Sequence, residues 1–389
     1  MKKVLSGNSA AAYGSMLVRA EVISAYPITP QTKIVEKIAD LIANGEFKTE
    51  FVKVESEHSA MAAAVSASLV GARTFTATSA QGLLLMHEIL HWASASRTPI
   101  VMVNINRGLA PPWSVWADQT DSIAQRDTGW MQFYCESCQE VLDTMIQLYK
   151  VAEDKDVLLP AMLSEDAFLL SHTSEIVDIP DQEKVDDFLG TFDPEYKLDV
   201  NRPMSFGSLS MPHQYYYEFR YKIAEAMENA KNKIIEVERD FEKVFGRSYG
   251  GFLDLYRCDG ADIVLVAAGS MSSTIRIAVD EMRDKGHKVG LARLRVFRPF
   301  PVEEFKKLAK DVKIIGVLDR SFCFGYEGAF FTEIKSALYN MDDRPLVKGY
   351  VVGIGGRDVT LDVIFEIIDD CMKTTDTKEE SFKWIGLKG

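Results

Sequence analysis

The chain has 389 residues, of which 47% are hydrophobic and 26% are charged, and its net charge at pH 7 is −13. This length allows two hydrophobic cores in an ordinary globular protein, and the negative charge disfavours binding to nucleic acid or to an anionic membrane. No apolar run reaches membrane-spanning length, the amino terminus lacks the apolar core of a signal peptide, and the five cysteines fit a reducing compartment, so we expect a cytoplasmic protein.

Strand and helix patterns alternate along the first part of the chain. Strands are expected at residues 21–26, 49–54, 73–79 and 100–106, with helices at 31–45, 57–72 and 83–96. Helical crossovers between successive strands build a parallel sheet with helices on its faces. We therefore predict that residues 1–175 form one three-layer α/β domain.

The helix at 83–96 contains His-Glu-x-x-His, the spacing with which a helix presents two zinc ligands and a general base. A zinc hydrolase using His87, Glu88 and His91 is therefore one alternative. A catalytic zinc also needs a third ligand and an open position for water, and the surrounding sequence supplies neither recognisably. The helix is apolar nearly all round, so we expect His87 and His91 to be buried, hydrogen-bonded packing residues.

The middle of the chain, residues 176–256, is predicted to be a connector that contains a long helix. An acidic, proline-bearing stretch precedes a helical pattern at 214–246, in which apolar residues recur at steps of three and four. These residues form one continuous seam. The seam packs either against the body of the chain or against a partner.

A second series of strands and helices begins near Ala261 and predicts a separate three-layer α/β domain at residues 257–389. Its glycine-bearing turns at 269–273 and 353–358 are either tight turns at strand ends or phosphate cradles at helix amino termini. Neither turn has the glycine spacing of a dinucleotide fingerprint or a Walker loop.

Several segments together resemble the α subunit of 2-oxoacid:ferredoxin oxidoreductases. They are "YPITPQT" (26–32), "VESEHSAMAAAVSAS" (54–68), "GARTFTATSAQGLLLMHEILHWASASRTPIV" (71–101), "DQTDSIAQRDTGWMQFY" (118–134), "LRVFRPFP" (294–301), "GVLDRSFCFGYEG" (316–328) and "GIGGRDVT" (353–360). The resemblance implies an amino-terminal thiamine diphosphate pyrimidine-binding domain and a carboxyl-terminal transketolase-C-like domain. It also implies oxidative decarboxylation of a 2-oxoacid, in anaerobic metabolism, to an acyl-coenzyme A and carbon dioxide, with electrons passed to ferredoxin.

The chain lacks parts that this reaction needs. It has no Gly-Asp-Gly, the motif that usually marks the metal site for the diphosphate of thiamine diphosphate. Its one Cys-x-x-Cys pair, Cys135 and Cys138, cannot hold an iron–sulfur cluster alone. We expect no metal site in this chain. The resemblance instead implies a β subunit that brings the diphosphate site, magnesium and a cluster, a γ subunit or domain, and a ferredoxin-like δ subunit. The alternative is a transketolase-like assembly subunit without a catalytic residue.

The resemblance assigns the catalytic carboxylate to Glu57, beside the aminopyrimidine ring of thiamine diphosphate. Glu55 is the competing carboxylate. Glu57 also begins the helix at 57–72, where the helix dipole alone favours an acidic residue. The turn that holds Pro27, Ile28 and Thr29 is expected to contribute to cofactor binding.

The substrate carboxylate needs a cation and hydrogen-bond donors, and by resemblance these are Arg107 and Thr29. Both follow predicted strands at the carboxyl edge of the sheet, where open α/β sheets bind ligands. The structural alternatives are a surface ion pair for Arg107 and a helix cap for Thr29.

The stretch between Arg107 and Asp118 contains Trp113 and Trp116. Its sequence resembles the branched-chain (2-oxoisovalerate) members more than the pyruvate synthases, so we favour a branched-chain or aryl 2-oxoacid over pyruvate as the substrate. The two tryptophans either line an apolar pocket for a bulky side chain or pack against a partner subunit.

Overall fold

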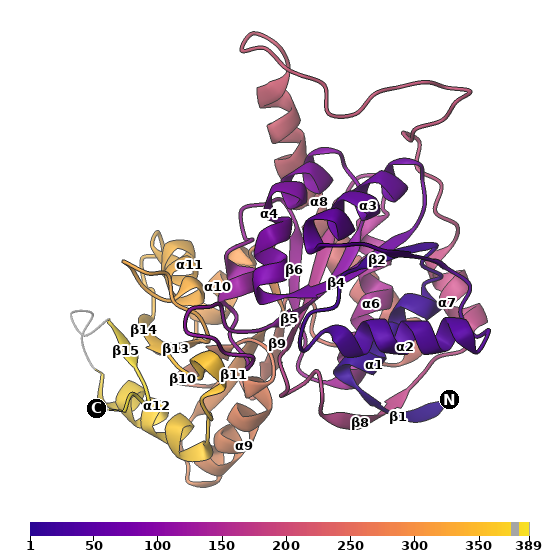
Figure 1. Cartoon of the computed structure of the whole chain (residues 1–389). Coiled ribbons are helices and arrows are strands. Elements are labelled where there is room, and N and C mark those ends of the chain that lie inside the picture. The colour runs from indigo at the N-terminus through magenta and orange to yellow at the C-terminus, as the bar shows by residue number, and fades with distance from the viewer. Residues whose placement is uncertain (375–380, 389) are drawn as a thin grey trace.

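The computed structural model describes residues 1–374 and 381–388, which form two open sheets with helices on both faces of each (Figure 1). This arrangement confirms the predicted α/β class with parallel-sheet domains. Within the described residues, no helix is both long and apolar enough to cross a membrane.

The first sheet has seven strands. They are β2 (Val22–Ala25), β3 (Glu50–Lys53), β4 (Thr74–Ser79), β5 (Val101–Asn106), β6 (Met131–Tyr134), β7 (Ala161–Asp166) and β12 (Val296–Arg298). Their order is β12-β6-β7-β5-β4-β2-β3, and every neighbouring pair is parallel except β12 and β6. The four predicted strands, β2 to β5, begin and end within one residue of their expected positions, because β-branched and apolar runs bounded by turns mark buried parallel strands well.

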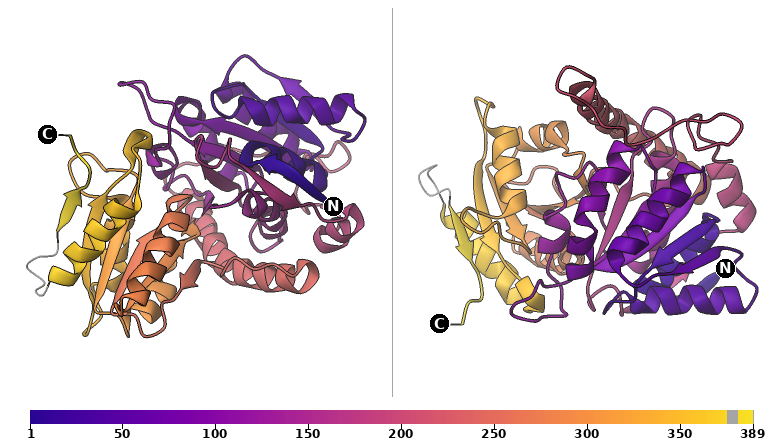
Figure 2. Two further views of the ribbon diagram at one scale, coloured as in Figure 1. Left: turned by 90° about the horizontal axis from the view of Figure 1, so that it is seen from below. Right: turned by 45° about the horizontal axis from the view of Figure 1, so that its top comes forward.

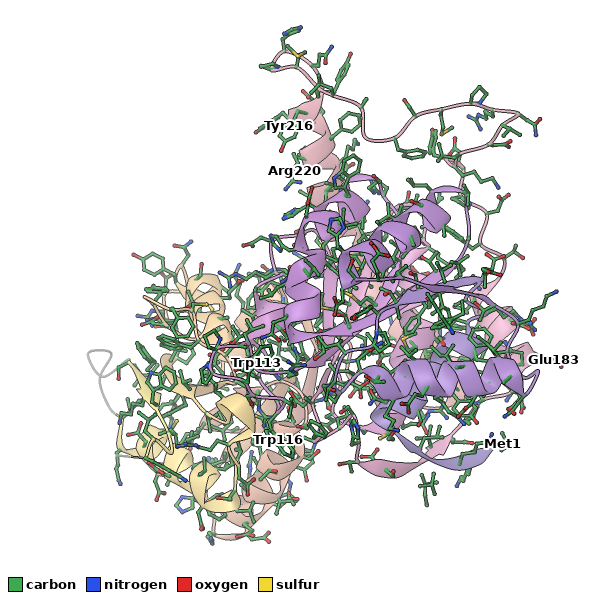
Figure 3. All side chains as sticks on the ribbon, in the orientation of Figure 1. Met1, Trp113, Trp116, Glu183, Tyr216 and Arg220 are labelled. Atoms are coloured by element: carbon green, nitrogen blue, oxygen red, sulfur yellow. The ribbon has the colours of Figure 1, made fainter. Side chains whose placement is uncertain are left out.

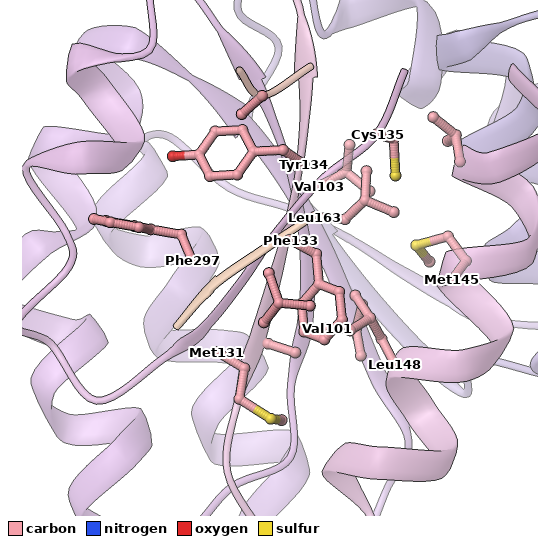
Figure 4. Packing of buried hydrophobic residues seen from close by; sticks show 14 of the residues in the cluster. Val101, Val103, Met131, Phe133, Tyr134, Cys135, Met145, Leu148, Leu163 and Phe297 are labelled. Atoms are coloured by element: carbon pink, nitrogen blue, oxygen red, sulfur yellow. The ribbon is translucent and has the colours of Figure 1, made fainter. Parts of the chain in front are cut away.

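Helices cover both faces of this sheet. One face carries α1 (Gly7–Leu17), α2 (Thr32–Ala43) and α6 (Cys138–Ala152), and the other carries α3 (Glu57–Leu69), α4 (Ala80–Ala95) and the short α5 (Thr120–Ile123). Figure 4 shows one side of the core, where strand residues such as Val103 and Phe133 pack against Met145 and Leu148 of α6. A small hairpin-like sheet, β1 (Lys2–Ser6) with β8 (Ser174–Asp178), lies beside these layers.

The connector contains α7 (Gln182–Leu189) and the long helix α8 (Tyr216–Phe245). The predicted seam is correct for the second half of α8, where Ala230, Ile234 and Phe241 are buried. The chain itself does not cover the first turns, where Tyr216 and Phe219 are 63% and 60% exposed. These turns project beyond the first sheet and its helices, as Figure 1 and the right view of Figure 2 show.

The second sheet has six strands in the order β15-β14-β13-β10-β11-β9. Its elements are β9 (Leu253–Tyr256), β10 (Ile263–Ala267), α9 (Met271–Asp284), β11 (Val289–Leu294), α10 (Val302–Ala309), β13 (Ile314–Asp319), α11 (Ala329–Leu338), β14 (Leu346–Val351), a 3-10 turn (Ile354–Gly356), α12 (Leu361–Lys373) and β15 (Phe382–Trp384). Helices α9 and α12 cover one face, and α10 and α11 cover the other. The predicted unit 257–389 includes residues 375–380 and 389, which lie outside the described residues.

One strand crosses between the two halves. The sequence predicted a single strand followed by a turn at residues 287–301, whereas the chain forms β11 in the second sheet and then β12 in the first. Strand β12 pairs antiparallel with β6, and Phe297 is fully buried beside Tyr134 (Figure 4). Both halves also contribute to one hydrophobic cluster, so a continuous core joins them.

Candidate active site at the carboxyl ends of the first sheet

Glu57 is the first residue of α3, which is capped by Ser56 through a hydrogen bond from the Ser59 amide to the Ser56 hydroxyl. The Glu57 side chain is buried, with 7% exposure, and has no hydrogen-bond or ion-pair partner among the described residues. Glu55, by contrast, is exposed and accepts a hydrogen bond from the Ser59 hydroxyl, which lowers its pKa. Burial without an internal partner leaves the Glu57 carboxylate available to a ligand.

The first turn of α4 passes directly beside Glu57. A Cβ atom added at Gly82 would lie 2.6 Å from both Glu57 Oε1 and the Thr78 hydroxyl oxygen, so only glycine fits there. The Thr78 hydroxyl and the Gln81 amide nitrogen are both buried without a partner among the described residues. A partnerless carboxylate beside a glycine wall and two unused polar groups fits a flat nitrogen heterocycle such as the thiamine pyrimidine ring.

Arg107 follows β5 and is 5% exposed. Its guanidinium donates from Nη1 to the Thr29 carbonyl at 2.6 Å, from Nη2 to Gln81 Oε1 at 3.1 Å, and from Nε to the Ser114 carbonyl at 3.3 Å. No described carboxylate forms an ion pair with it, and burial lowers its pKa. Three of the five N–H groups are therefore occupied by neutral acceptors, and two remain for an anion.

The turn after β2 supplies the wall opposite Gln81. Pro27 and Thr29 are exposed and Ile28 is half-buried. The turn is fixed by a bond of 3.3 Å from the Ile28 amide to Gln31 Oε1 and by one of 2.9 Å from the Asn8 amide group to the Pro30 carbonyl. Thr29 contacts Arg107 through its backbone carbonyl and not through its hydroxyl.

Asp121 is a residue of this site that sequence reasoning missed. It is fully buried and accepts five hydrogen bonds, from the backbone amides of Ala80, Arg107 and Ser122 and from the side-chain amides of Asn104 and Asn106. It therefore ties the ends of β4 and β5 together, where Ala80 has a positive φ of 46°. The available signals were its place in the "DQTDS" segment and the two asparagines on a buried strand.

Gln81 was also missed, and it links the two predicted groups. Its side-chain oxygen accepts a hydrogen bond from Arg107, and the next residue in the chain, Gly82, faces Glu57. The structure thus brings Glu57, Arg107 and Thr29 to one place at the carboxyl ends of β2, β4 and β5. The signal that pointed to Gln81 was its position directly after a predicted strand, where parallel sheets bind ligands.

The His-Glu-x-x-His residues lie on α4, but the expectation that both histidines are buried is wrong. His87 is exposed, with Nδ1 2.6 Å from Gln125 Oε1, and His91 is half-buried with its ring 5.0 Å from that of His87. The Glu88 side chain is 77% exposed and reaches towards His58. Among the described residues, no group of three or more His, Cys, Asp or Glu side chains is placed to hold a metal ion.

Cys135 and Cys138 are both buried around the start of α6, and burial raises the pKa of each thiol well above its usual range. The Cys138 thiol donates to the Thr173 carbonyl at 3.3 Å. Cysteines bind an iron–sulfur cluster as thiolates, whereas burial in the protein interior keeps these two groups as thiols. Their positions support the predicted structural role.

Two family descriptions match the chain, one on each half. "Pyruvate flavodoxin/ferredoxin oxidoreductase, thiamine diP-bdg" matches residues 13–239, and "Pyruvate:ferredoxin oxidoreductase core domain II" matches residues 261–364. The chain therefore belongs to the 2-oxoacid:ferredoxin oxidoreductase family, and its first half is the thiamine diphosphate-binding domain of that family. The resemblance inferred from the sequence is confirmed.

Individual relatives extend over the full length. The chain is 54% identical to the ketoisovalerate oxidoreductase subunit VorA of Pyrococcus horikoshii, covering 100% of this chain and 98% of the relative. It is 50% identical to the pyruvate synthase subunit PorA of Methanothermobacter thermautotrophicus, covering 99% and 98%.

Among solved structures, a 2-oxoglutarate:ferredoxin oxidoreductase from Magnetococcus marinus matches in fold with a TM-score of 0.72 and 19% identity. The match covers 96% of this chain and 65% of that chain.

Proposed function

We propose that this chain is the α subunit of a thiamine diphosphate-dependent 2-oxoacid:ferredoxin oxidoreductase of the cytoplasm. Such an enzyme converts a 2-oxoacid and coenzyme A to an acyl-coenzyme A and carbon dioxide, and passes the electrons to ferredoxin. The observation that carries the proposal is the buried Arg107 guanidinium, which has no carboxylate partner among the described residues, together with the buried Glu57 carboxylate, which has no partner of any kind among them. A buried cation and a buried anion that do not pair with each other each call for a ligand group.

In this proposal Glu57 binds the cofactor. Its carboxyl group forms a hydrogen bond with a pyrimidine ring nitrogen, and the approach passes over Gly82, where no side chain intervenes. The turn at 27–29 forms the adjoining wall. When bound, thiamine diphosphate supplies the carbon nucleophile that attacks a 2-oxo group. The buried Gln81 amide nitrogen, which has no partner among the described residues, is an additional donor at this position.

Arg107 binds the substrate carboxylate in this proposal. Its contacts with the Thr29 and Ser114 carbonyls and with Gln81 fix the plane of the guanidinium, so little rotational freedom is lost when an anion binds. The two remaining N–H groups match the two oxygens of a carboxylate. Asp121 fixes the Arg107 backbone from the opposite side.

For the substrate, we favour a branched-chain or aryl 2-oxoacid over pyruvate. The relatives include ketoisovalerate oxidoreductase subunits at 54% identity and pyruvate synthase subunits at 50%, and this difference is small. The favoured reading rests on Trp113 and Trp116 in the loop that begins at Arg107. They are 78% and 50% exposed, so the pocket they line needs a partner subunit as its other wall.

The remaining chemistry belongs to partner subunits in this proposal. A β subunit supplies the diphosphate site, magnesium and an iron–sulfur cluster, and a γ subunit or domain and a ferredoxin-like δ subunit complete the complex. Exposed apolar residues on α4 support a partner that packs against this helix. Leu84, Leu85 and Trp92 are 38%, 50% and 48% exposed and follow helical spacing.

Glu57→Gln in the assembled complex tests the proposal. It keeps the shape of the side chain but removes the charge, so we expect thiamine diphosphate occupancy to remain and turnover to fall by about 10²–10⁴-fold. Glu55→Gln is the matched control and should leave turnover near the wild-type value. Wild-type turnover in the Glu57 variant would instead favour the assembly-subunit alternative, in which this chain has no catalytic residue.

A further inference from the structure

The loop that follows Arg107, residues 108–117, folds back onto the arginine. The Gly108 amide donates to the Trp116 carbonyl at 3.0 Å, and the Ser114 carbonyl accepts from Arg107 Nε at 3.3 Å. A Cβ on Gly108 would lie 3.0 Å from the Ser114 Cβ. Residues 114–116 therefore form part of the immediate surroundings of the guanidinium, and any shift of Trp116 is transmitted to the position beside Arg107.

The outer side of this loop is held by the second half of the chain. The Gly356 amide donates to the Ala117 carbonyl at 2.9 Å, and Gly356 has a φ of +76°. A Cβ added there would lie 2.3 Å from the Trp116 Cβ and 3.0 Å from its Cγ. On its other side, the Trp116 ring packs against Phe168 with the centroids 4.7 Å apart. The Trp116 side chain, which is labelled in Figure 3, thus contacts both the glycine loop 353–356 and Phe168.

Further hydrogen bonds hold the carboxyl edges of the two sheets together. The Gln119 amide donates to the Arg320 carbonyl at 2.9 Å. Asp166, at the end of β7, accepts bonds of 2.8 and 2.6 Å from the amide and hydroxyl of Ser270, at the start of α9. The carboxyl edges of the two sheets therefore face each other, and residues at the ends of β10, β13 and β14 meet those at the ends of β5 and β7.

We propose that the glycine loop 353–356 is a specificity-determining element of the 2-oxoacid site, acting through Trp116. It sets how close residues 114–116 lie to Arg107, and so sets the space beside the bound substrate carboxylate. The second half of the chain thereby takes part in choosing the substrate side chain, although it contributes no group to Arg107 directly. The inference rests on the proposed role of Arg107.

Gly356→Ala in the assembled complex tests the proposal, with pyruvate and 2-oxoisovalerate as the two probes. The added methyl group displaces Trp116, so we expect the ratio of kcat/KM for the two substrates to change by about tenfold, the scale on which pockets discriminate small apolar groups. The KM for coenzyme A and the thiamine diphosphate occupancy should stay unchanged. Gly286→Ala is the matched control, because Gly286 also has a positive φ, +89°, but has nothing within 4 Å of an added Cβ.

A double-mutant cycle separates the contact from backbone strain. In a Trp116→Gly background, the added methyl group no longer meets a side chain, so Gly356→Ala should leave the substrate ratio unchanged there. If the Gly356 variant does not assemble, Trp116→Phe tests the proposal instead. The smaller ring between Gly356 and Phe168 must also change the ratio of kcat/KM for the two substrates.

Unaltered ratios in these variants, together with loss of substrate binding in Arg107→Ala, would overturn the inference alone. An Arg107→Ala complex with wild-type KM and kcat would instead remove the proposed function on which the inference rests.

Discussion

Arg107 illustrates at the residue scale how the protein prepares a binding group. Its guanidinium is buried and charged, yet its three protein partners are neutral oxygens rather than a carboxylate. An internal carboxylate would have been the simpler way to stabilise a buried cation, but it would compete with an anionic substrate. Neutral carbonyls hold the arginine in place and leave its charge for the ligand.

Substitution of Arg107 should therefore affect substrate binding more than cofactor binding. We expect Arg107→Ala to raise the KM for the 2-oxoacid and to lower kcat/KM. Arg107→Lys should restore only part of the loss, because an ammonium group cannot make a two-point contact with a carboxylate. Steady-state kinetics at varied 2-oxoacid and at varied coenzyme A check this, since the KM for coenzyme A should not move.

Thr29→Val should have a smaller effect than either change at Arg107. The substitution removes the hydroxyl but keeps the backbone carbonyl that binds Arg107, so at most one hydrogen bond to the substrate is lost. That corresponds to about 0.5–1.5 kcal/mol in kcat/KM. Kinetics of the single variants and of the double variant with Arg107→Lys decide the matter. Fully additive losses would show that the two residues do not share the substrate carboxylate.

Asp121 gives the site a dependence on pH. Burial raises its pKa to about 7, so the carboxylate is ionised above that pH and protonated below it. All five of its partners are N–H donors. A protonated Asp121 would therefore have no acceptor for its own O–H group and would lose part of these hydrogen bonds. We expect the KM for the 2-oxoacid to rise as the pH falls below about 7. Asp121→Asn should show a raised KM on both sides of that pH, and an unchanged profile in this variant would assign the titration to another group.

The sequence identified some of these residues and not others for physical reasons. Glu57 and Arg107 were assigned through the resemblance to the family, and the predicted strand ends and helix start only located them at the carboxyl edge of the sheet. Asp121 and Gln81 were not, because their importance comes from contacts between segments that are distant in the chain. The exposure of His87 was likewise decided by which side of α4 faces the sheet.

At the element scale, α11 shows how a buried carboxylate begins a helix. Asp319, at the end of β13, accepts bonds of 2.8 and 3.1 Å from the amides of Phe330 and Phe331 in the first turn. The helix starts directly against this carboxylate, because a Cβ on Gly328 would lie 2.2 Å from Asp319 Oδ2. The sequence predicted the helix from its apolar spacing, but the strand residue that caps it lies ten positions away and has no local signal.

Asp319→Ala should lower the stability of the second half. Two buried amides would lose their acceptor, which costs about 1–3 kcal/mol for each group left without a partner. Asp362→Ala is the control, because Asp362 also lies in the first turn of a helix, α12, but is exposed. Urea unfolding of the complex, followed through its transition midpoint, measures the difference. Equal midpoints for the two variants would contradict the prediction.

The same scale explains the partial success at α8. Apolar residues at steps of three and four indicate a buried seam, but the pattern cannot show what covers it. Ile234 and Phe241 are covered by the chain itself, whereas Tyr216 and Phe219 extend past its last layer. The chain thus covers the later part of the seam and leaves its first turns exposed.

At the scale of the whole molecule, a buried ionic network fastens the two halves. Glu140 of α6 accepts bonds of 2.9 and 2.7 Å from Arg293 Nη1 and one of 3.1 Å from Arg295 Nε, and all three side chains are almost fully buried. One carboxylate thus accepts hydrogen bonds from two guanidinium groups, one in β11 and one directly after it. The network depends on both halves being in place.

Glu140→Gln should destabilise the protein strongly. The change removes the carboxylate that both guanidinium groups share, while Arg293 keeps Glu136 and Asp254 and Arg295 keeps Glu238. Loss of one partner from a buried pair typically costs about 3–5 kcal/mol, and we expect a cost at the lower end of that range because other carboxylates remain. Thermal unfolding of the complex measures it. Glu183→Gln on the exposed face of α7 should leave the transition unchanged. A Glu140 variant with the same thermal unfolding midpoint as the control would show that the network is dispensable for stability.

The crossing strand β12 has a consequence for how the protein is made. Strand β6 emerges from the ribosome early, but the edge that it presents is covered only when residues 296–298 have been synthesised. Chain growth at about 5–20 residues per second leaves that edge uncovered for many seconds, during which it can pair with another nascent chain. The amino-terminal half, although it binds the cofactor in our proposal, therefore cannot finish folding before the second half has been translated as far as residue 298. A gene fragment that ends at residue 256 should yield an aggregating product.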